Sequence, residues 1–330
     1  MGNLFPDSDK VREWPVQSFS TIICGAMMRP IDLFFEQHTQ QGKNSPSKNK
    51  STIHKIEIPF TNYDPISWLS AYPIYPKFFW ANRDHSDVVV CMGSLVTLKA
   101  SPTCSLKNVF KKIRTVIARN PDVFFCGGSA FDPEKRLPIH WRALGQFFFF
   151  LPRFTLKKTT EGQILTVFLR NKEINPVYKN RLKEALKAMF SPDQAKKTVS
   201  EKPTLASMLS TQSQQDRPQK ERWIKNVNAI LESIHNKLYE KVVLARESRF
   251  HLPHPLAPDQ LFSILSKPSN TFDYYLQPDP RTAFLGRTPE LLFKRSKGEL
   301  YSEAVAGSLP VQAGTPVSAT QTEGLLNDNK

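Results

Sequence analysis

The chain has 330 residues, of which 40% are hydrophobic and 23% are charged, an ordinary composition for a soluble globular protein of one or two domains. Lys and Arg number 45 against 30 Asp and Glu, which gives a formal net charge of +15. The basic residues are dispersed and do not alternate with aromatic residues as a base-stacking surface requires, so we expect small anionic ligands and no nucleic-acid partner.

The sequence carries no signal for membrane insertion or export. No window approaches 18 consecutive apolar residues, and the first residues lack a basic region followed by an apolar run. The four cysteines are widely spaced and form no CxxC pair, which is typical of reduced structural thiols; they are Cys24, Cys91, Cys104 and Cys126. We therefore expect a cytoplasmic protein that makes no contact with a membrane.

The first 190 residues are predicted to form the N-terminal part of a mixed α and β fold. Strands are predicted over 54–60, 88–100, 146–158 and 164–170, and helices over 105–119 and 177–190. The third of these strands should end at Pro152 or soon after it. The run 122–132 reads as a strand, a Gly-Gly turn and a strand; Gly127-Gly128 lacks the rest of a nucleotide-binding fingerprint and is given a structural role.

The chain changes character after residue 190. Residues 191–220 are polar and have little periodicity, which indicates a long surface loop or linker. A helix is expected to begin near Glu221, because apolar residues then recur every three or four positions. Strands are predicted over 241–250, 283–295 and 301–310, with a short helix over 259–266, and residues 272–278 lead into the strand that carries Glu290. Residues 221–330 thus form a second region, whose strands carry unusual polar residues.

Three of these predicted strands hold the candidate site. Lys241 opens the first, Glu290 follows a Thr-Pro turn in the second, and Ala306, Gly307 and Ser308 interrupt the third. A base, an acid and a small-residue seat for an anion are the groups needed to move a hydroxyl group. Each feature also has a structural interpretation, namely a solvated lysine, a turn glutamate and a simple bulge.

Five stretches carry a resemblance to a known family. They are KVVLAR at 241–246, FLGRTPELLF at 284–293, SEAVAGS at 302–308, WLSAYPIYPKFFWANRD at 68–84 and FFCGGSAFDP at 124–133. The chain resembles the chorismate-utilising enzymes, and most closely the isochorismate synthases of the menaquinone and siderophore pathways. This resemblance implies an α/β/β/α sandwich, of α+β or α/β class, whereas periodicity alone gives only mixed α and β.

The resemblance implies chorismate as the substrate and isochorismate as the product. Water adds at C2 of the ring and the C4 hydroxyl leaves, so the reaction needs both a base and an acid. Lys241 is expected to activate the water from a site buried beside Val242 and Val243, and Glu290 is expected to protonate the leaving hydroxyl. Residues 306–308 would bind a substrate carboxylate through backbone N–H groups and the serine hydroxyl.

The resemblance also implies Mg²⁺, which members of the family bind through glutamates in later motifs. We expect those ligands to lie beyond Lys330, so that the metal site cannot close, the fold is incomplete at its C-terminus and isomerase activity is low. Glu303 and Arg246 are interpreted as structural partners. Two other functions remain open: a salicylate synthase, which also keeps the lysine at position 241, and a non-catalytic remnant or subunit. Relatives that add ammonia usually lack that lysine.

Overall fold

The computed structural model describes residues 21–41, 53–60, 64–101, 104–132, 135–189, 214–252, 256–257, 260–261, 270–296, 298–303 and 316–326. The chain divides into two compact units, each described by itself. The first unit comprises Met1–Ser47, Tyr63–Ile74 and Lys172–Ser266, and the second comprises Lys48–Asn62, Tyr75–Asn171 and Lys267–Lys330.

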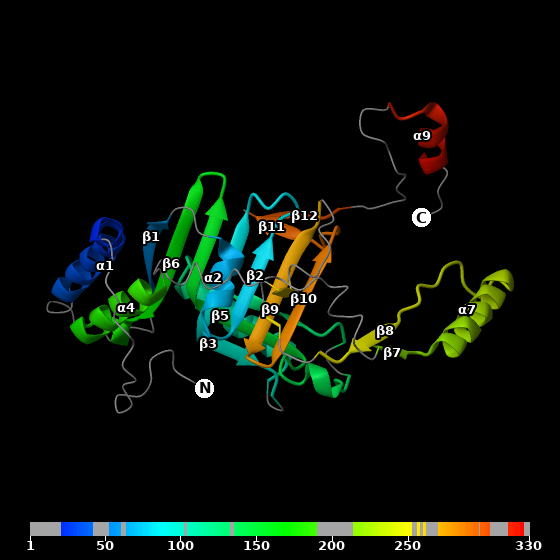
Figure 1. Cartoon of the computed structure of the whole chain (residues 1–330), viewed down its shortest axis with the longest axis horizontal. Coiled ribbons are helices and arrows are strands. Elements are labelled where there is room, and N and C mark those ends of the chain that lie inside the picture. Colours follow the sequence, from blue (N-terminus) through cyan, green and yellow to red (C-terminus); the bar gives the residue numbers. More distant parts are fainter. Residues whose placement is uncertain are drawn as a thin grey trace. The chain divides into compact units, whose positions relative to one another are not determined.

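An antiparallel sheet forms the centre of the second unit (Figure 1). Its strands follow the order β1-β6-β5-β3-β2-β9-β10, and β4 pairs with β5 beside this path. The strands are β1 Ile53–Phe60, β2 Lys77–Ala81, β3 Val88–Lys99, β4 Cys126–Ser129, β5 Phe147–Thr159, β6 Gly162–Arg170, β9 Phe272–Asp279 and β10 Thr282–Thr288. Because β2 pairs with β9, segments far apart in the sequence lie side by side within the sheet.

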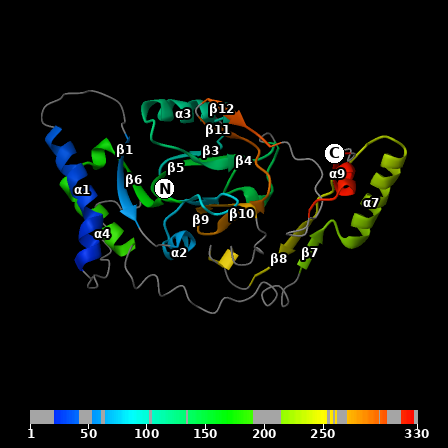
Figure 2. The same cartoon turned by 90° about the horizontal axis from the view of Figure 1, so that it is seen from above.

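The phenylalanines of β5 explain why this strand lies inside the sheet. Phe148 and Phe150 belong to a buried apolar cluster with Cys91 and Cys126 of the neighbouring strands. Helix α3 (Leu106–Arg119) lies over one face of the sheet (Figure 2) and packs its buried side chains, Val109 and Ile113, against Phe147. The N-terminus of α3 is capped by the Ser105 hydroxyl, which accepts a hydrogen bond from the Asn108 amide at 3.3 Å.

Two predictions about this sheet are wrong. Strand β5 does not end at Pro152 but continues to Thr159, because Pro152 faces Ser94 where the register between β3 and β5 shifts. Proline is tolerated at such a bulge, since it lacks the N–H that a regular ladder uses. Gly127-Gly128 does not form a turn either. Both glycines lie within β4, which runs close to β5.

The C-terminal part of the second unit contains short elements. Strand β11 (Lys294–Ser296) pairs with β12 (Glu299–Tyr301), and helix α9 spans Ala319–Leu326. Earlier in the same unit, 3-10 helix η1 spans Ile139–Trp141, between β4 and β5. The predicted single strand over 283–295 is therefore two strands, β10 and β11, separated by a segment that begins at Pro289. Proline has no N–H for the ladder, which accounts for the break after β10.

The described part of the first unit is largely helical. Its helices are α1 Thr21–Gln41, α2 Pro65–Ala71, α4 Pro176–Met189 and α7 Lys220–His235; 3-10 helix η2 spans Asn171–Glu173 at the boundary of the units, and β7 Gln214–Arg217 pairs with β8 Glu247–Phe250. Helices α1 and α4 are joined by Asp32, whose carboxylate lies 2.6 Å from the ammonium groups of both Lys179 and Lys183. Hydrogen bonds from Lys179 and Lys183 lower the pKa of Asp32 below its usual value.

Most predicted elements outside the candidate site are confirmed. The helices expected over 105–119 and 177–190 and from Glu221 correspond to α3, α4 and α7. The segment 191–220, expected as a linker, includes strand β7 from residue 214, and its earlier part lies outside the described residues. Most of the helix predicted over 259–266 also lies outside them. Within the described residues, no helix is long and apolar enough to cross a membrane.

Candidate functional site

The structure places the predicted base on an exposed segment of the first unit. Lys241 lies between α7 and β8, in a stretch without regular secondary structure, and the strand predicted over 241–250 is limited to β8. The expected burial is wrong: Lys241 is exposed, and the side chain of Val243 is 82% exposed. Arg246 acts as a structural partner, as predicted, because it lies 3.9 Å from Asp216 and over the ring of Trp223.

The predicted acid lies in the second unit, immediately after β10. Glu290 is exposed, and its amide donates a hydrogen bond to the hydroxyl of Thr288 at 3.2 Å. This local bond closes the turn that the Thr-Pro sequence predicts. Residues 306–308, the predicted anion seat, lie outside the described residues.

Two charged residues contact the peptide groups on either side of Glu290. Arg83, from the loop between β2 and β3, forms a bidentate ion pair with Glu303, with Nη1 2.7 Å from Oε1 and Nη2 2.5 Å from Oε2. Arg83 Nε also donates to the carbonyl oxygen of Pro289 at 3.1 Å. Glu303 Oε2 accepts a hydrogen bond from the amide of Leu291 at 3.3 Å.

The electrostatics of this pair are mutual. Hydrogen bonds from Arg83 lower the pKa of the Glu303 carboxyl, and hydrogen bonding to Glu303 raises the pKa of Arg83. Both groups therefore carry their charges at neutral pH. The prediction that Glu303 is a structural partner is confirmed, whereas Arg83 was not singled out from the sequence. Its position in the polar sequence Asn-Arg-Asp after strand β2 is the signal that could have identified it.

A second ion pair lies at the same end of the β9–β10 hairpin. Asp273, which is 2% exposed, accepts a hydrogen bond from Arg287 Nε at 3.0 Å, and His85 Nε2 lies 3.4 Å from its other oxygen. Register pairs Asp273 with Arg287 across β9 and β10, and pairs Ala81 of β2 with Asp273. The two ion pairs thus fix the ends of β2, β9 and β10 from which the Glu290 turn emerges.

The described residues do not fit a magnesium site. They contain no cluster of three or more His, Cys, Asp or Glu side chains that could hold a metal ion. Glu303, whose carboxylate contacts the Glu290 turn at Leu291, is already bonded through both oxygens to Arg83. Mg²⁺ requires several oxygen ligands in near-octahedral geometry, and the described residues bring no such set together.

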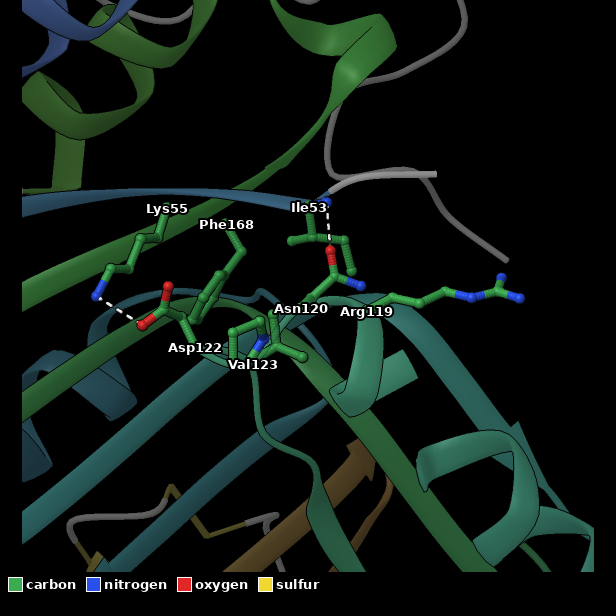
Figure 3. A pocket seen from close by; sticks show the side chains of 8 residues that line it. Ile53, Lys55, Arg119, Asn120, Asp122, Val123 and Phe168 are labelled. Atoms are coloured by element: carbon green, nitrogen blue, oxygen red, sulfur yellow. Dashed lines mark hydrogen bonds and ion pairs between the residues drawn. The ribbon is translucent and has the colours of Figure 1, made fainter. Parts of the chain in front are cut away.

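A separate small cavity of about 150 Å³ lies between β1 and the segment that follows α3 (Figure 3). Its walls include Lys55, which lies 3.1 Å from Asp122, and Asn120, whose side-chain oxygen accepts a hydrogen bond from the Ile53 amide at 2.8 Å. Hydrogen bonding to Asp122 raises the pKa of Lys55, which keeps this lysine charged. None of the predicted site residues lines this cavity.

Comparisons with known proteins agree with the fold. The family model described as "Chorismate binding enzyme" matches residues 37–330. The isochorismate synthase MenF of Escherichia coli (strain K12) is 27% identical over 286 residues, which are 84% of this chain and 59% of that protein. MenF of Bacillus subtilis (strain 168) is 25% identical over 86% of this chain and 63% of that protein. The chain thus spans less than two thirds of the length of these relatives.

A solved structure agrees with the fold. The menaquinone-specific isochorismate synthase MenF from Escherichia coli matches 92% of this chain and 65% of its own chain, with a TM-score of 0.59 and 22% sequence identity. This match supports a chorismate-binding fold of mixed α+β class. Since the family model covers nearly the whole chain and the fold agrees, the protein belongs to the chorismate binding enzymes.

Proposed function

We propose that this protein is an isochorismate synthase, an isomerase that converts chorismate to isochorismate. The observation that carries the proposal is the similarity to isochorismate synthases over more than four fifths of the chain, together with a family match that includes both Lys241 and Glu290. The names of these relatives refer to MenF and to menaquinone, so we place the product in menaquinone biosynthesis, with siderophore biosynthesis as the alternative.

Glu290 is proposed as the general acid that protonates the leaving C4 hydroxyl. Its carboxyl group is exposed, so a substrate can reach it, and the backbone on both sides of it is bonded to other parts of the second unit. A positioned acid of this kind accelerates a reaction that expels a poor leaving group, because the hydroxyl departs as water.

Lys241 is proposed as the general base that activates water for attack at C2. A lysine acts as a base in its neutral form, which removal of water from around the amine favours. The proposal therefore requires that bound substrate and the residues around it exclude water from Lys241 during turnover. Gly307, Ser308 and Ala306 are proposed to bind a substrate carboxylate, and Mg²⁺ is proposed as the cofactor on the family resemblance.

Product analysis tests this proposal. The purified chain is incubated with chorismate and Mg²⁺, and isochorismate, salicylate and pyruvate are separated by chromatography. Lys241→Ala and Glu290→Gln should each lower kcat by about 100- to 10,000-fold, the usual contribution of a general base or acid. Lys225→Ala and Glu299→Gln, at exposed positions of the same two units, are the matched controls and should leave kcat unchanged.

Two outcomes would count against the proposal. Release of pyruvate with salicylate would identify a salicylate synthase instead. Equal kcat values for the wild type and both site variants would show that Lys241 and Glu290 do not act in the chemical step.

A further inference from the structure

The loop between β2 and β3 brings one arginine to the turn that carries the proposed acid. The guanidinium of Arg83 forms two parallel bonds to the Glu303 carboxylate, at 2.7 and 2.5 Å. The same guanidinium donates twice to the carbonyl oxygen of Pro289, from Nε at 3.1 Å and from Nη2 at 2.5 Å. This planar fork of donors fixes direction as well as distance, which a lysine cannot do.

The pair encloses Glu290 from both sides along the chain. Arg83 bonds the carbonyl group of Pro289, which precedes Glu290, and Glu303 accepts the amide of Leu291, which follows it. The amide of Glu290 itself is bonded to Thr288 at 3.2 Å. Three consecutive residues are therefore held through their backbone groups, while the Glu290 side chain stays exposed and available to a ligand.

Arg83 is in turn held in place by its own surroundings. Its guanidinium lies 4.8 Å from the centre of the Phe272 ring, and that ring stacks on Trp80 with centroids 6.0 Å apart. At the base of the loop, Asn82 and Asp87 exchange two hydrogen bonds, at 3.0 and 2.9 Å. The arginine is thus anchored to the sheet before it reaches the turn.

We infer that Arg83 and Glu303 are positioning residues that set the location of the Glu290 carboxyl group in the reaction. The inference rests on the proposed function of Glu290 for its catalytic consequence. A misplacement of about 1 Å in a reacting group can lower a rate by about 100-fold. The two residues do not need to touch the substrate for this effect, because they act through the backbone of Pro289 and Leu291.

The first test removes each partner. Arg83→Gln and Glu303→Gln should each lower kcat for isochorismate formation by about 100-fold and change KM by less than about threefold, because the acid is displaced while substrate binding is kept. Arg281→Gln is the matched control, since it removes an exposed arginine at the opposite end of β10. It should leave both constants unchanged.

A charge-swapped variant separates positioning from simple stabilisation. The double change Arg83→Glu with Glu303→Arg restores an ion pair, but a glutamate at 83 cannot donate to the Pro289 carbonyl and an arginine at 303 cannot accept the Leu291 amide. We expect the swap to recover the Tm lost in the single variants and to leave kcat low. Recovery of kcat together with Tm would overturn the inference.

Amide hydrogen exchange tests the positioning role of Arg83 and Glu303 by a measurement that does not depend on turnover. Exchange in a peptide covering residues 286–292 should rise at least tenfold in Arg83→Gln, Glu303→Gln and the swapped variant, while peptides from β3 and β5 stay unchanged. Unchanged exchange at Glu290 and Leu291 would overturn the inference. If wild type forms no isochorismate, or Glu290→Gln keeps full turnover, the proposed function fails by itself, and the exchange data still report on the turn.

Discussion

Lys77 gives the sharpest prediction on stability, because it is a lysine in the middle of a sheet. It lies on β2 between Met92 of β3 and Gln277 of β9, and it is 2% exposed. Burial lowers the pKa of Lys77 from its usual 10.5 to about 8. A fall of this size corresponds to about 3 kcal/mol that the charged form costs the folded state at neutral pH.

The sign of the pH dependence follows from proton binding. In the unfolded chain Lys77 keeps its proton up to about pH 10.5, whereas the folded protein releases it near pH 8. Between these values the unfolded state binds more protons, so the contribution of Lys77 makes the free energy of unfolding rise with pH. The penalty is fully present below pH 8 and is lost as the pH approaches 10.5.

Lys77→Met should therefore stabilise the protein at pH 7. The ammonium lies 5.1 Å from the centre of the Tyr75 ring, and loss of that contact costs about 1 kcal/mol, so the net gain is at most about 2 kcal/mol. The gain should shrink as the pH rises from 8 to 9.5. Urea unfolding of wild type, Lys77→Met and the exposed control Lys157→Met at pH 7, 8, 9 and 9.5 measures it.

The difference in the free energy of unfolding between Lys77→Met and wild type cancels the contributions of other titrating groups. Burial raises the pKa of Tyr275, so this phenol lowers stability once the unfolded chain ionises near pH 10, in both proteins alike. A difference between Lys77→Met and wild type that stays constant from pH 7 to pH 9.5 would refute the reasoning. So would a variant that is less stable than wild type at pH 7.

Two further predictions use paired variants and denaturant unfolding. Gly127→Ala should lower the free energy of unfolding by about 2 to 6 kcal/mol, because φ is +147° and a Cβ would lie 2.0 Å from the carbonyl oxygen of Phe148. Gly128→Ala is the paired variant. Its Cβ would meet no atom within 4 Å, so it should lower the free energy of unfolding by less than about 1 kcal/mol. Equal costs would contradict the close approach of β4 to β5. Arg287→Met should cost about 3 to 5 kcal/mol, because the buried carboxylate of Asp273 loses its nearest cation, and replacing both residues by apolar ones should restore most of the loss. A single-variant cost below about 1 kcal/mol would refute this.

The regular elements were largely predictable from the sequence, because periodicity and composition report burial directly. Phe148 and Phe150 could only belong to an interior strand, and the apolar spacing in α3, α4 and α7 predicted helices close to their observed bounds. Predictions that depend on a partner strand were weaker. Pro152 looked like a strand end, but the shifted register of β3 accommodates it.

The exposure of Lys241 was not predictable in this way. Val242 and Val243 have the composition of a strand, and a strand is normally buried on at least one face. In the described part of the first unit, pairing with β7 begins only at Glu247, so this apolar pair stays outside any strand. The composition of a segment shows that it can pack against a partner, but it does not show which segment that partner is.

The Glu290 turn is held both by a hydrogen bond within its own sequence and by contacts with residues far away in the sequence. The hydrogen bond between Thr288 and Glu290 is contained in the Thr-Pro-Glu sequence, and the sequence predicted a turn there. The bonds from Arg83 and Glu303 depend on β2 pairing with β9, so they arise only after the sheet has formed. Since an acid acts through its position as well as its chemical identity, the position of Glu290 depends on contacts with Arg83 and Glu303 that the sequence does not reveal. Variants at Arg83 should for this reason change turnover although Thr288, Pro289 and Glu290 are unchanged.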